Sequence, residues 1–173
     1  MNQTIETIMK RKGVKSYTDQ QVSDSDLQII LEAGIAGPTG RNSQARHFTV
    51  VQNKELLKKI NDEVHALMKA APDYVPLYGA PTLIITSAPA ELPHADMDCA
   101  AAVQNMLLAA TSLGLGSRFL VSPTRYIESN PEIKKTLGIP EGYRSVACAI
   151  LGYDANPSQP PVERNKNVVN YVR

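Results

Sequence analysis

The sequence has no tryptophan, only two cysteines and no large excess of either charge. Phenylalanine and tyrosine supply an aromatic content of 5% in 173 residues, so surfaces for stacking nucleic-acid bases are poorly supplied. The formal net charge of +1 gives no global field that would attract nucleic acid or an anionic membrane. Any basic site must therefore be local.

Long apolar runs are also missing. The apolar segments are too short and too interrupted to span a bilayer, and the first residues lack the apolar stretch of a signal peptide. Cys99 and Cys148 lie inside apolar runs and outside any CxxC pattern. Free cysteines of this kind pack as small hydrophobic residues, which predicts reduced buried thiols and a cytoplasmic location.

The familiar catalytic and nucleotide-binding motifs are absent. The sequence contains no GxGxxG, GxxxxGK[ST], GxSxG, HExxH or paired-carboxylate pattern. His47, His65 and His94 have no metal-ligand spacing. We therefore expect no metal site and name no catalytic side chain.

What is present is typical of one globular domain, residues 1–173, with 43% hydrophobic and 20% charged residues. Apolar periodicity and capping residues predict helices over 3–12, 23–35, from the Asn53 cap onward, over 95–113 and from Pro131, and strands over 47–52, 82–87, 117–121 and 143–153. Helices that alternate with or flank four strands indicate an α/β or α+β fold.

The predicted helix over 95–113 is unusual because residues 99–113 contain no charge. Its most apolar face combines Cys99, Ala102, Val103, Met106, Leu107 and Ala110. A helix that is apolar nearly all round is buried on most sides. This segment therefore lies either at the centre of the core or in an oligomer interface.

Three cations surround Gly13: Arg11, Lys12 and Lys15. Such a cluster could hold a phosphate, with backbone N–H groups exposed by the glycine. The simpler interpretation is a solvated helix end whose charges complement the helix dipole. In the tail, Arg164 and Lys166 could either join this site or form a charged terminus.

A small polar loop follows the second predicted helix, with the sequence PTGRNSQ over residues 38–44. Its amide side chains offer both donors and acceptors, which suits the edge of an isoalloxazine ring, although an ordinary polar turn has the same composition. Gly114 and Gly116 could let a ring approach the backbone, or Gly114 could only end a helix. Residues 119–122 would bring backbone amides to the end of a strand, and together these segments suggest a flavin nucleotide.

In this order, the segments resemble the nitroreductase family of FMN enzymes. The matching stretches are RKGVKSY, PTGRNSQ, DCAAAVQNMLLAATSLGLGSRFL, LGIPEGYRSVACAILGY and PPVERNKNVVNYV, which together extend from Ile5 to Tyr171. The LGIPEGY stretch, residues 137–143, is the most specific motif, and its glycines and proline are expected to set a helix end and a turn. Elsewhere the resemblance depends on order and spacing.

The resemblance implies an α+β fold with a central mixed sheet flanked by helices, and a homodimer with FMN at its interface and an exchanged C-terminal tail. It also assigns residues. The phosphate and ribityl chain would be held by Arg11, Lys12, Gly13 and Lys15, with Arg164 and Lys166 completing the phosphate site. The isoalloxazine would be contacted from the other subunit by Pro38, Thr39, Gly40 and Asn42, and through backbone groups by Leu120, Val121 and Ser122.

The sequence departs from the family pattern at three places. Gly13 replaces a serine that usually contacts phosphate, and Ala45-Arg46 replaces a common Pro-Trp pair. Only residues 72–81 stand where larger members carry extra helices over the flavin.

The activity implied by the resemblance is ping-pong transfer of a hydride from NAD(P)H through FMN to a planar electron-poor acceptor, such as a nitroaromatic or quinone. A flavin-consuming or dehalogenating enzyme of the same fold, a flavin-binding sensor without turnover and a purely structural dimer are the alternatives. The sequence does not choose between NADH and NADPH.

Overall fold

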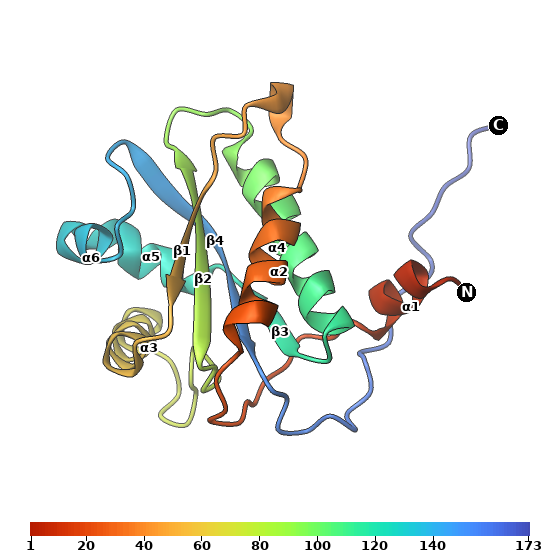
Figure 1. Cartoon of the computed structure of the whole chain (residues 1–173), viewed down its shortest axis with the longest axis horizontal. Helices are drawn as coiled ribbons and strands as arrows, with labels where there is room; N and C mark the ends of the chain where they lie inside the picture. Colours follow the sequence, from red (N-terminus) through yellow and green to blue (C-terminus); the bar gives the residue numbers. More distant parts are fainter.

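The computed structural model describes all 173 residues, with the elements in an alternating order (Figure 1). The elements are α1 (Gln3–Lys10), α2 (Asp24–Ile35), a 3₁₀ turn η1 (Gly40–Asn42), β1 (His47–Val51), α3 (Lys54–Met68), β2 (Thr82–Pro89), α4 (Ala95–Ser112), β3 (Gly116–Leu120), α5 (Ser122–Ser129), α6 (Pro131–Thr136) and β4 (Tyr143–Gly152). No helix is long and apolar enough to cross a membrane.

The four strands form one sheet in the order β1-β2-β4-β3, and every neighbouring pair is antiparallel. The expectation of a mixed sheet is therefore wrong for the strands of this chain. The cause is the position of β4. Helix α4 connects β2 to β3 as a crossover between two strands of the same direction, but β4 lies between them and pairs antiparallel with both. The one parallel contact is an isolated bridge between Gly13 and Ser117.

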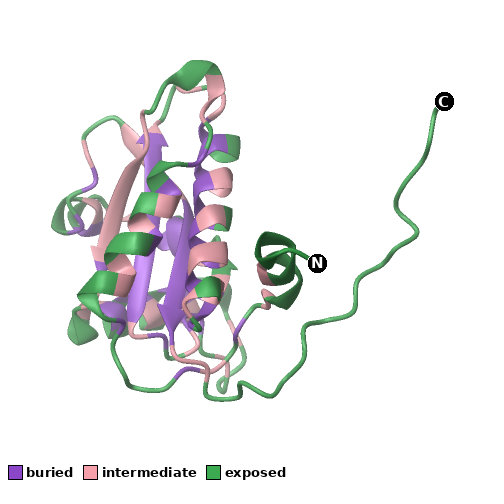
Figure 2. Cartoon of the chain, turned by 45° about the vertical axis from the view of Figure 1, so that its right-hand side comes forward, coloured by how far each residue is buried: buried purple, intermediate pink, exposed green.

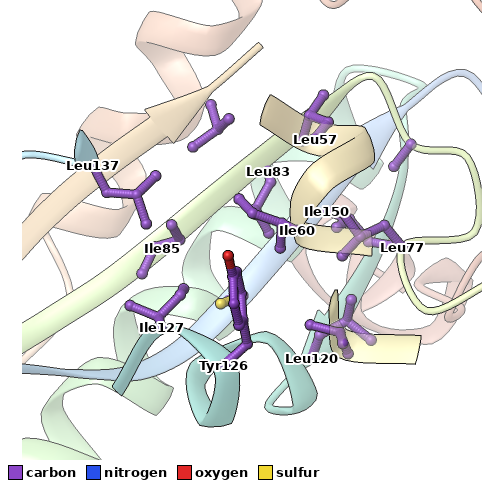
Figure 3. Close-up of a cluster of buried hydrophobic side chains, with 14 of the residues drawn as sticks. Leu57, Ile60, Leu77, Leu83, Ile85, Leu120, Tyr126, Ile127, Leu137 and Ile150 are labelled. Carbon is purple, nitrogen blue, oxygen red and sulfur yellow. The ribbon is translucent and has the colours of Figure 1, made fainter. Parts of the chain in front are cut away.

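Helices cover both faces of the sheet, with α2 and α4 on one side and α3 and α5 on the other (Figure 1). Successive residues of β2 and β4 point to opposite faces, and because both faces are covered their runs are apolar throughout. Ile84 packs under α4, whereas Leu83 and Ile85 join the cluster around α3 and α5 (Figure 3). The fold class is α+β.

Helix α4 has its predicted face fully buried. All six residues expected on that face are between 0% and 1% exposed. On its other side, Leu108, Ala109 and Asn105 line an open hollow of about 460 Å³ shared with α1 and α2. The helix is thus the centre of the core, with one flank that remains accessible in the single chain.

Local signals predicted the helix starts well. Ser23, Asn53 and Asn130 each accept a backbone N–H three residues on, as N-caps do. Gly138 has a φ of 65° after α6, and Gly114 has a φ of 77° after α4, where the amide of Leu115 bonds the carbonyl of Ala110.

Two boundaries differ from expectation. Helix α1 ends at Lys10 with Arg11 as its C-cap, and Gly13 does not end it because Gly13 is already in an extended bridge. Residues 122–129 form α5, which the sequence analysis did not predict. This helix buries Tyr126 and Ile127, and the chain can turn into it because a proline is accepted in a first helical turn.

The two ends of the chain lie outside this core. From Ala155 onward every residue is exposed, and the tail runs away from the domain beside α1 (Figures 1 and 2). Cys99 and Cys148 are buried free thiols, as predicted. Burial raises the pKa of Cys99 to about 11 and raises that of Cys148 as well, so neither thiol ionises readily.

Candidate functional site

The cationic segment after α1 is held between β3 and the chain that leaves β4. Val14 donates its amide to the carbonyl of Ser117 at 3.0 Å, and Thr18 donates to that of Tyr153 at 2.9 Å. In return, Ala155 donates to the carbonyl of Ser16 at 3.0 Å. The sequence therefore places its basic cluster on an extended backbone that is fixed on both sides.

Successive side chains along this extended backbone point to opposite sides, so neighbouring cations have different surroundings. Val14 is buried in the core. Lys12 pairs with Asp154 at 2.8 Å and donates to the carbonyls of Asn156, Pro157 and Gln159 at 3.2, 3.3 and 2.6 Å. Its ammonium thus binds the start of the tail, which is a different role from the predicted contact with phosphate.

Arg164 affects the charge of Arg11 although the two lie far apart in the sequence. Burial lowers the pKa of the Arg11 guanidinium, and the positive charge of Arg164 lowers it further. Neither side chain has a carboxylate partner, and Lys15 is exposed without an ion pair. Like charges brought together without an acid form an attractive place for an anion. Lys166 lies two residues along the exposed tail, beside a hollow that it shares with Arg164.

The glycine pair has a structural explanation. A Cβ on Gly116 would lie 3.0 Å from the Val14 side chain and 3.3 Å from Asp154, so this glycine lets the chain's own segments approach β3. Gly114 ends α4. The idea that both glycines admit a ring to the backbone is therefore wrong, because Gly116 is already covered by the protein itself.

The predicted backbone contacts lie where β3 turns into α5. Leu120 is the last residue of β3 and is buried, whereas Val121 is 52% exposed. Ser122 begins α5, and no side chain caps this helix. The start of α5 is the positive end of its dipole and can serve an electron-rich ligand, although Pro123 has no N–H and the amide of Thr124 already bonds the carbonyl of Val121 at 3.0 Å.

The polar loop forms a second structure at another end of the molecule. Pro38 and Asn42 are exposed, and Thr39 and Gly40 are half-buried. Arg41, Asn42 and Gln44 all have positive φ, at 55°, 54° and 49°. Non-glycine residues adopt this conformation at a cost and persist in it only where their surroundings hold them.

Two side chains that the sequence analysis did not assign hold this loop. Arg46 donates to four backbone carbonyls, those of Ile35, Gly37, Pro38 and Asp98, at 2.6–3.3 Å. Asp98, which is 5% exposed, accepts the amide of Gly40 at 2.8 Å through Oδ1. A polar residue in place of the family's usual aromatic was the signal for Arg46, but Asp98 looked only like an acidic residue in a first helical turn.

Within one chain the two sets of predicted contacts do not meet. The loop lies at one end of the sheet (top of Figure 1), whereas the cationic segment lies toward the other end, from which the tail leaves and then rises past α1 to the C-terminus at the upper right. Two hollows of about 460 and 470 Å³ are lined by none of the predicted cofactor residues. The chain therefore carries two separate half-sites, which we call the cationic half (residues 11–17, 116–122 and 164) and the loop half (residues 36–46 with Asp98).

Comparison with known proteins identifies the class. The model of the nitroreductase family matches residues 8–153. A protein of Archaeoglobus fulgidus, provisionally named NADH dehydrogenase/NAD(P)H nitroreductase, is 34% identical over 88% of this chain and 86% of its own length. A protein of Methanothermobacter thermautotrophicus with the same name is 36% identical over 88% of this chain and 78% of its own.

Solved structures agree. A nitroreductase with bound FMN from Bacteroides fragilis superimposes with a TM-score of 0.89 at 32% identity, and one from Desulfitobacterium hafniense with 0.91 at 33%, each over 100% of both chains. The chain belongs to the nitroreductase family.

Proposed function

We propose that this protein uses FMN to pass a hydride from NAD(P)H, through the flavin N5, to an electron-poor acceptor such as a nitroaromatic or quinone in a ping-pong reaction. Family membership makes the chain an NAD(P)H-dependent flavin oxidoreductase with FMN as its cofactor. The named acceptors, the reaction order and the residue roles are the proposal.

The observation that carries the proposal is a set of cations on a fixed backbone that have no carboxylate partner: Arg11, Lys15 and, from the tail, Arg164. A phosphate monoester can accept charge-assisted hydrogen bonds from more than one such cation. The residues of the cationic half therefore fit the phosphate of FMN. The free ammonium of Lys15 lies on the same segment and is suited to stabilise negative charge at the edge of a reduced ring.

The loop half fits a planar neutral ring better than a phosphate. The guanidinium of Arg46 is taken up by backbone carbonyls of the same chain, so the groups that the loop offers are its backbone, the small polar side chains of Thr39 and Asn42, and the exposed guanidinium of Arg41. The backbone and the small polar side chains can donate to and accept from the edge of an isoalloxazine. The proposed role of this loop is to position the ring.

Because the halves lie apart, the proposal requires a second copy of the chain, whose loop half would face the first chain's cationic half. Exposed apolar groups support this homodimer. Ile5, Ile8 and Met9 on α1 are 42%, 44% and 64% exposed. Exposed valines also follow along the tail, and apolar side chains left exposed in one chain are suited to pack on another.

The test is direct. Purified protein should be yellow, should lose its visible absorbance when NADH or NADPH is added without oxygen, and should regain it on addition of a quinone or nitroaromatic. Protein that is colourless and takes up no FMN would contradict the proposal. Yellow protein that no nicotinamide can bleach would favour a flavin-binding sensor.

A second candidate is reduction of free flavin or removal of a halogen. Relatives named NADPH-flavin oxidoreductase from Vibrio harveyi and iodotyrosine deiodinase from Thermotoga neapolitana are 26% and 25% identical to this chain. Analysis of products with free FMN, an iodotyrosine and a nitroaromatic as competing acceptors would separate these activities.

A further inference from the structure

The cationic half contains a third arginine that no sequence motif marked. Arg118, in the middle of β3, donates from Nη1 to the carbonyl of Gly13 at 3.4 Å. Its guanidinium lies over the ring of Tyr78, 4.6 Å from the ring centre. The bridge between Gly13 and Ser117 brings these residues together.

We propose that Arg118 is a phosphate-binding residue of the FMN site, and that its guanidinium fills the space of the side chain missing at position 13. The inference rests on the proposed function. It adds a residue that the family pattern does not supply.

Geometry is the first argument. A Cβ built on Gly13 would lie 3.1 Å from Arg118 Nη1, and the next nearest atoms also belong to Arg118. A serine at position 13 would point its hydroxyl toward the space that the guanidinium now occupies. The donor that the family pattern places there is thus replaced by a longer side chain that reaches the same place from the neighbouring strand.

The unused donors of Arg118 are the second argument. A guanidinium has five N–H donors, yet the long contact with Gly13 is the one hydrogen bond that the side chain of Arg118 makes. Its Nε is buried without a partner, and so is the hydroxyl of Tyr17. An arginine with so few partners has capacity for an anion.

Charge balance is the third argument. Arg118 forms no ion pair. Asp154, whose backbone follows β4 beside the cationic segment, is already bound to Lys12 at 2.8 Å. Arg11, two residues from Gly13 in the sequence, also forms no ion pair, so two guanidinium groups of the cationic half have no acid that balances them. A ligand that carries two negative charges would supply the missing balance.

Tyr78 prepares the guanidinium for this role. The ring holds it from one side through a cation–π contact and is itself packed edge-on against Tyr74. A guanidinium fixed in this way loses less freedom when it binds than a solvated one.

The experiment compares FMN with riboflavin, which lacks the phosphate, by titration into apoprotein followed through flavin fluorescence. In R118M, we expect FMN affinity to fall about tenfold while riboflavin affinity stays within about twofold, because only the phosphate contact is removed. R144Q is the matched control, since Arg144 pairs with Asp96 at 2.8 Å at the other end of β4.

The double variant G13S/R118M sharpens the test. A serine returned to position 13 should recover part of the lost FMN affinity, which the loss of an unrelated structural contact would not allow. If R118M does not fold, R118K replaces it in the test, because lysine keeps the positive charge but lacks the paired donors of a guanidinium. R118K should lose less affinity for FMN than is expected for R118M, and again none for riboflavin.

If R118M lost affinity for FMN and riboflavin equally, or for neither, the inference would be overturned. The proposed function would still stand, provided that the wild-type protein binds FMN. The inference would also be overturned if R118M weakened only the binding of NADPH and not that of NADH or FMN. Arg118 would then bind the phosphate of the nicotinamide donor. Wild-type protein that binds no FMN contradicts the proposed function itself.

Discussion

The two half-sites use arginine in opposite ways. In the cationic half, Arg11, Arg118 and Arg164 lack acids, so their charge is left for a ligand. In the loop half, Arg46 spends all its contacts on the chain's own carbonyls, and its charge shapes the backbone instead. The comparison teaches that a count of basic residues does not locate an anion site. Free guanidinium groups do so only where several come from different segments, since the loop half also carries one exposed and unpaired arginine, Arg41.

The largest expected effect follows from removing the charge of Arg11. R11Q should weaken FMN binding about hundredfold, because charge-assisted hydrogen bonds to a phosphate are the strongest contacts of the proposed site. Riboflavin binding should change much less. Parallel fluorescence titrations measure both.

K10Q is the control for this variant, since it removes a charge at the end of the same helix where no contact is proposed. If R11Q bound FMN as tightly as K10Q, the cations would only complement the helix dipole, and the contrast between the halves would disappear.

The next effect should come from Arg46. R46M removes donors from four carbonyls and frees a loop that contains three residues with positive φ. We expect about tenfold weaker binding of FMN and riboflavin alike, since this half would hold the ring and not the phosphate. Hydrogen exchange over residues 36–46 should rise with it.

R41M provides the comparison for Arg46, because Arg41 lies on the same loop and makes no ion pair. If R46M lost affinity for FMN while its affinity for riboflavin stayed unchanged, the loop half would bind the phosphate. The assignment of the phosphate to the cationic half and of the ring to the loop half would then be wrong.

A smaller effect should follow from Lys12. K12M removes the ion pair with Asp154 and the contacts with carbonyls 156, 157 and 159 that fix the start of the tail. Arg164 would then be held less firmly beside Arg11, and we expect about a fivefold loss of FMN affinity. Faster amide exchange near residues 154–160 is the accompanying sign, and unchanged exchange there would contradict the role assigned to Lys12.

The smallest effect on the site should come from Glu128, which lies outside both halves. Burial tends to raise its pKa, but hydrogen bonds from Ser145 and the ion pair with Lys134 outweigh this and lower it. Because the pKa of Glu128 is lower in the folded protein, the carboxylate stabilises the fold at pH values above its unfolded pKa of about 4.3. This stabilisation is lost as the pH falls through the folded pKa.

E128Q should therefore cost about 1 kcal/mol of unfolding free energy at pH 7, a value reduced by the partial exposure of the pair, and the difference should shrink below about pH 4. Urea unfolding at both pH values measures it. FMN affinity should stay at the wild-type value, and a loss would place Glu128 in the site after all.

The parts of the fold that the sequence predicted are those set by local chemistry. Ser23, Asn53 and Asn130 cap helices, and Gly114 and Gly138 end them, because each acts on residues within four positions. The pairing of the strands is a long-range choice. No local pattern in the sequence of β4 predicts that this strand lies between β2 and β3.

The site divides in the same way. Arg11, Gly13 and Lys15 could be found because they stand in one short motif. Asp98 and Arg118 could not, because each acts on a residue that the fold brings to it: Gly40, 58 residues from Asp98, and Gly13, 105 residues from Arg118. The thirteen cofactor contacts named from the resemblance stay predictions until a flavin complex is measured.

The separation of the two half-sites means that two different variants could repair one another in a mixed dimer. If each flavin is held by the cationic half of one chain and the loop half of another, R11Q damages one half of a site and R46M damages the other. A mixture of the two variants should form hybrid dimers in which one site carries both substitutions and the other carries neither. At an FMN concentration too low to fill the sites of either variant alone, a mixture should thus regain colour and turnover, and the yield of recovered sites would count the hybrids.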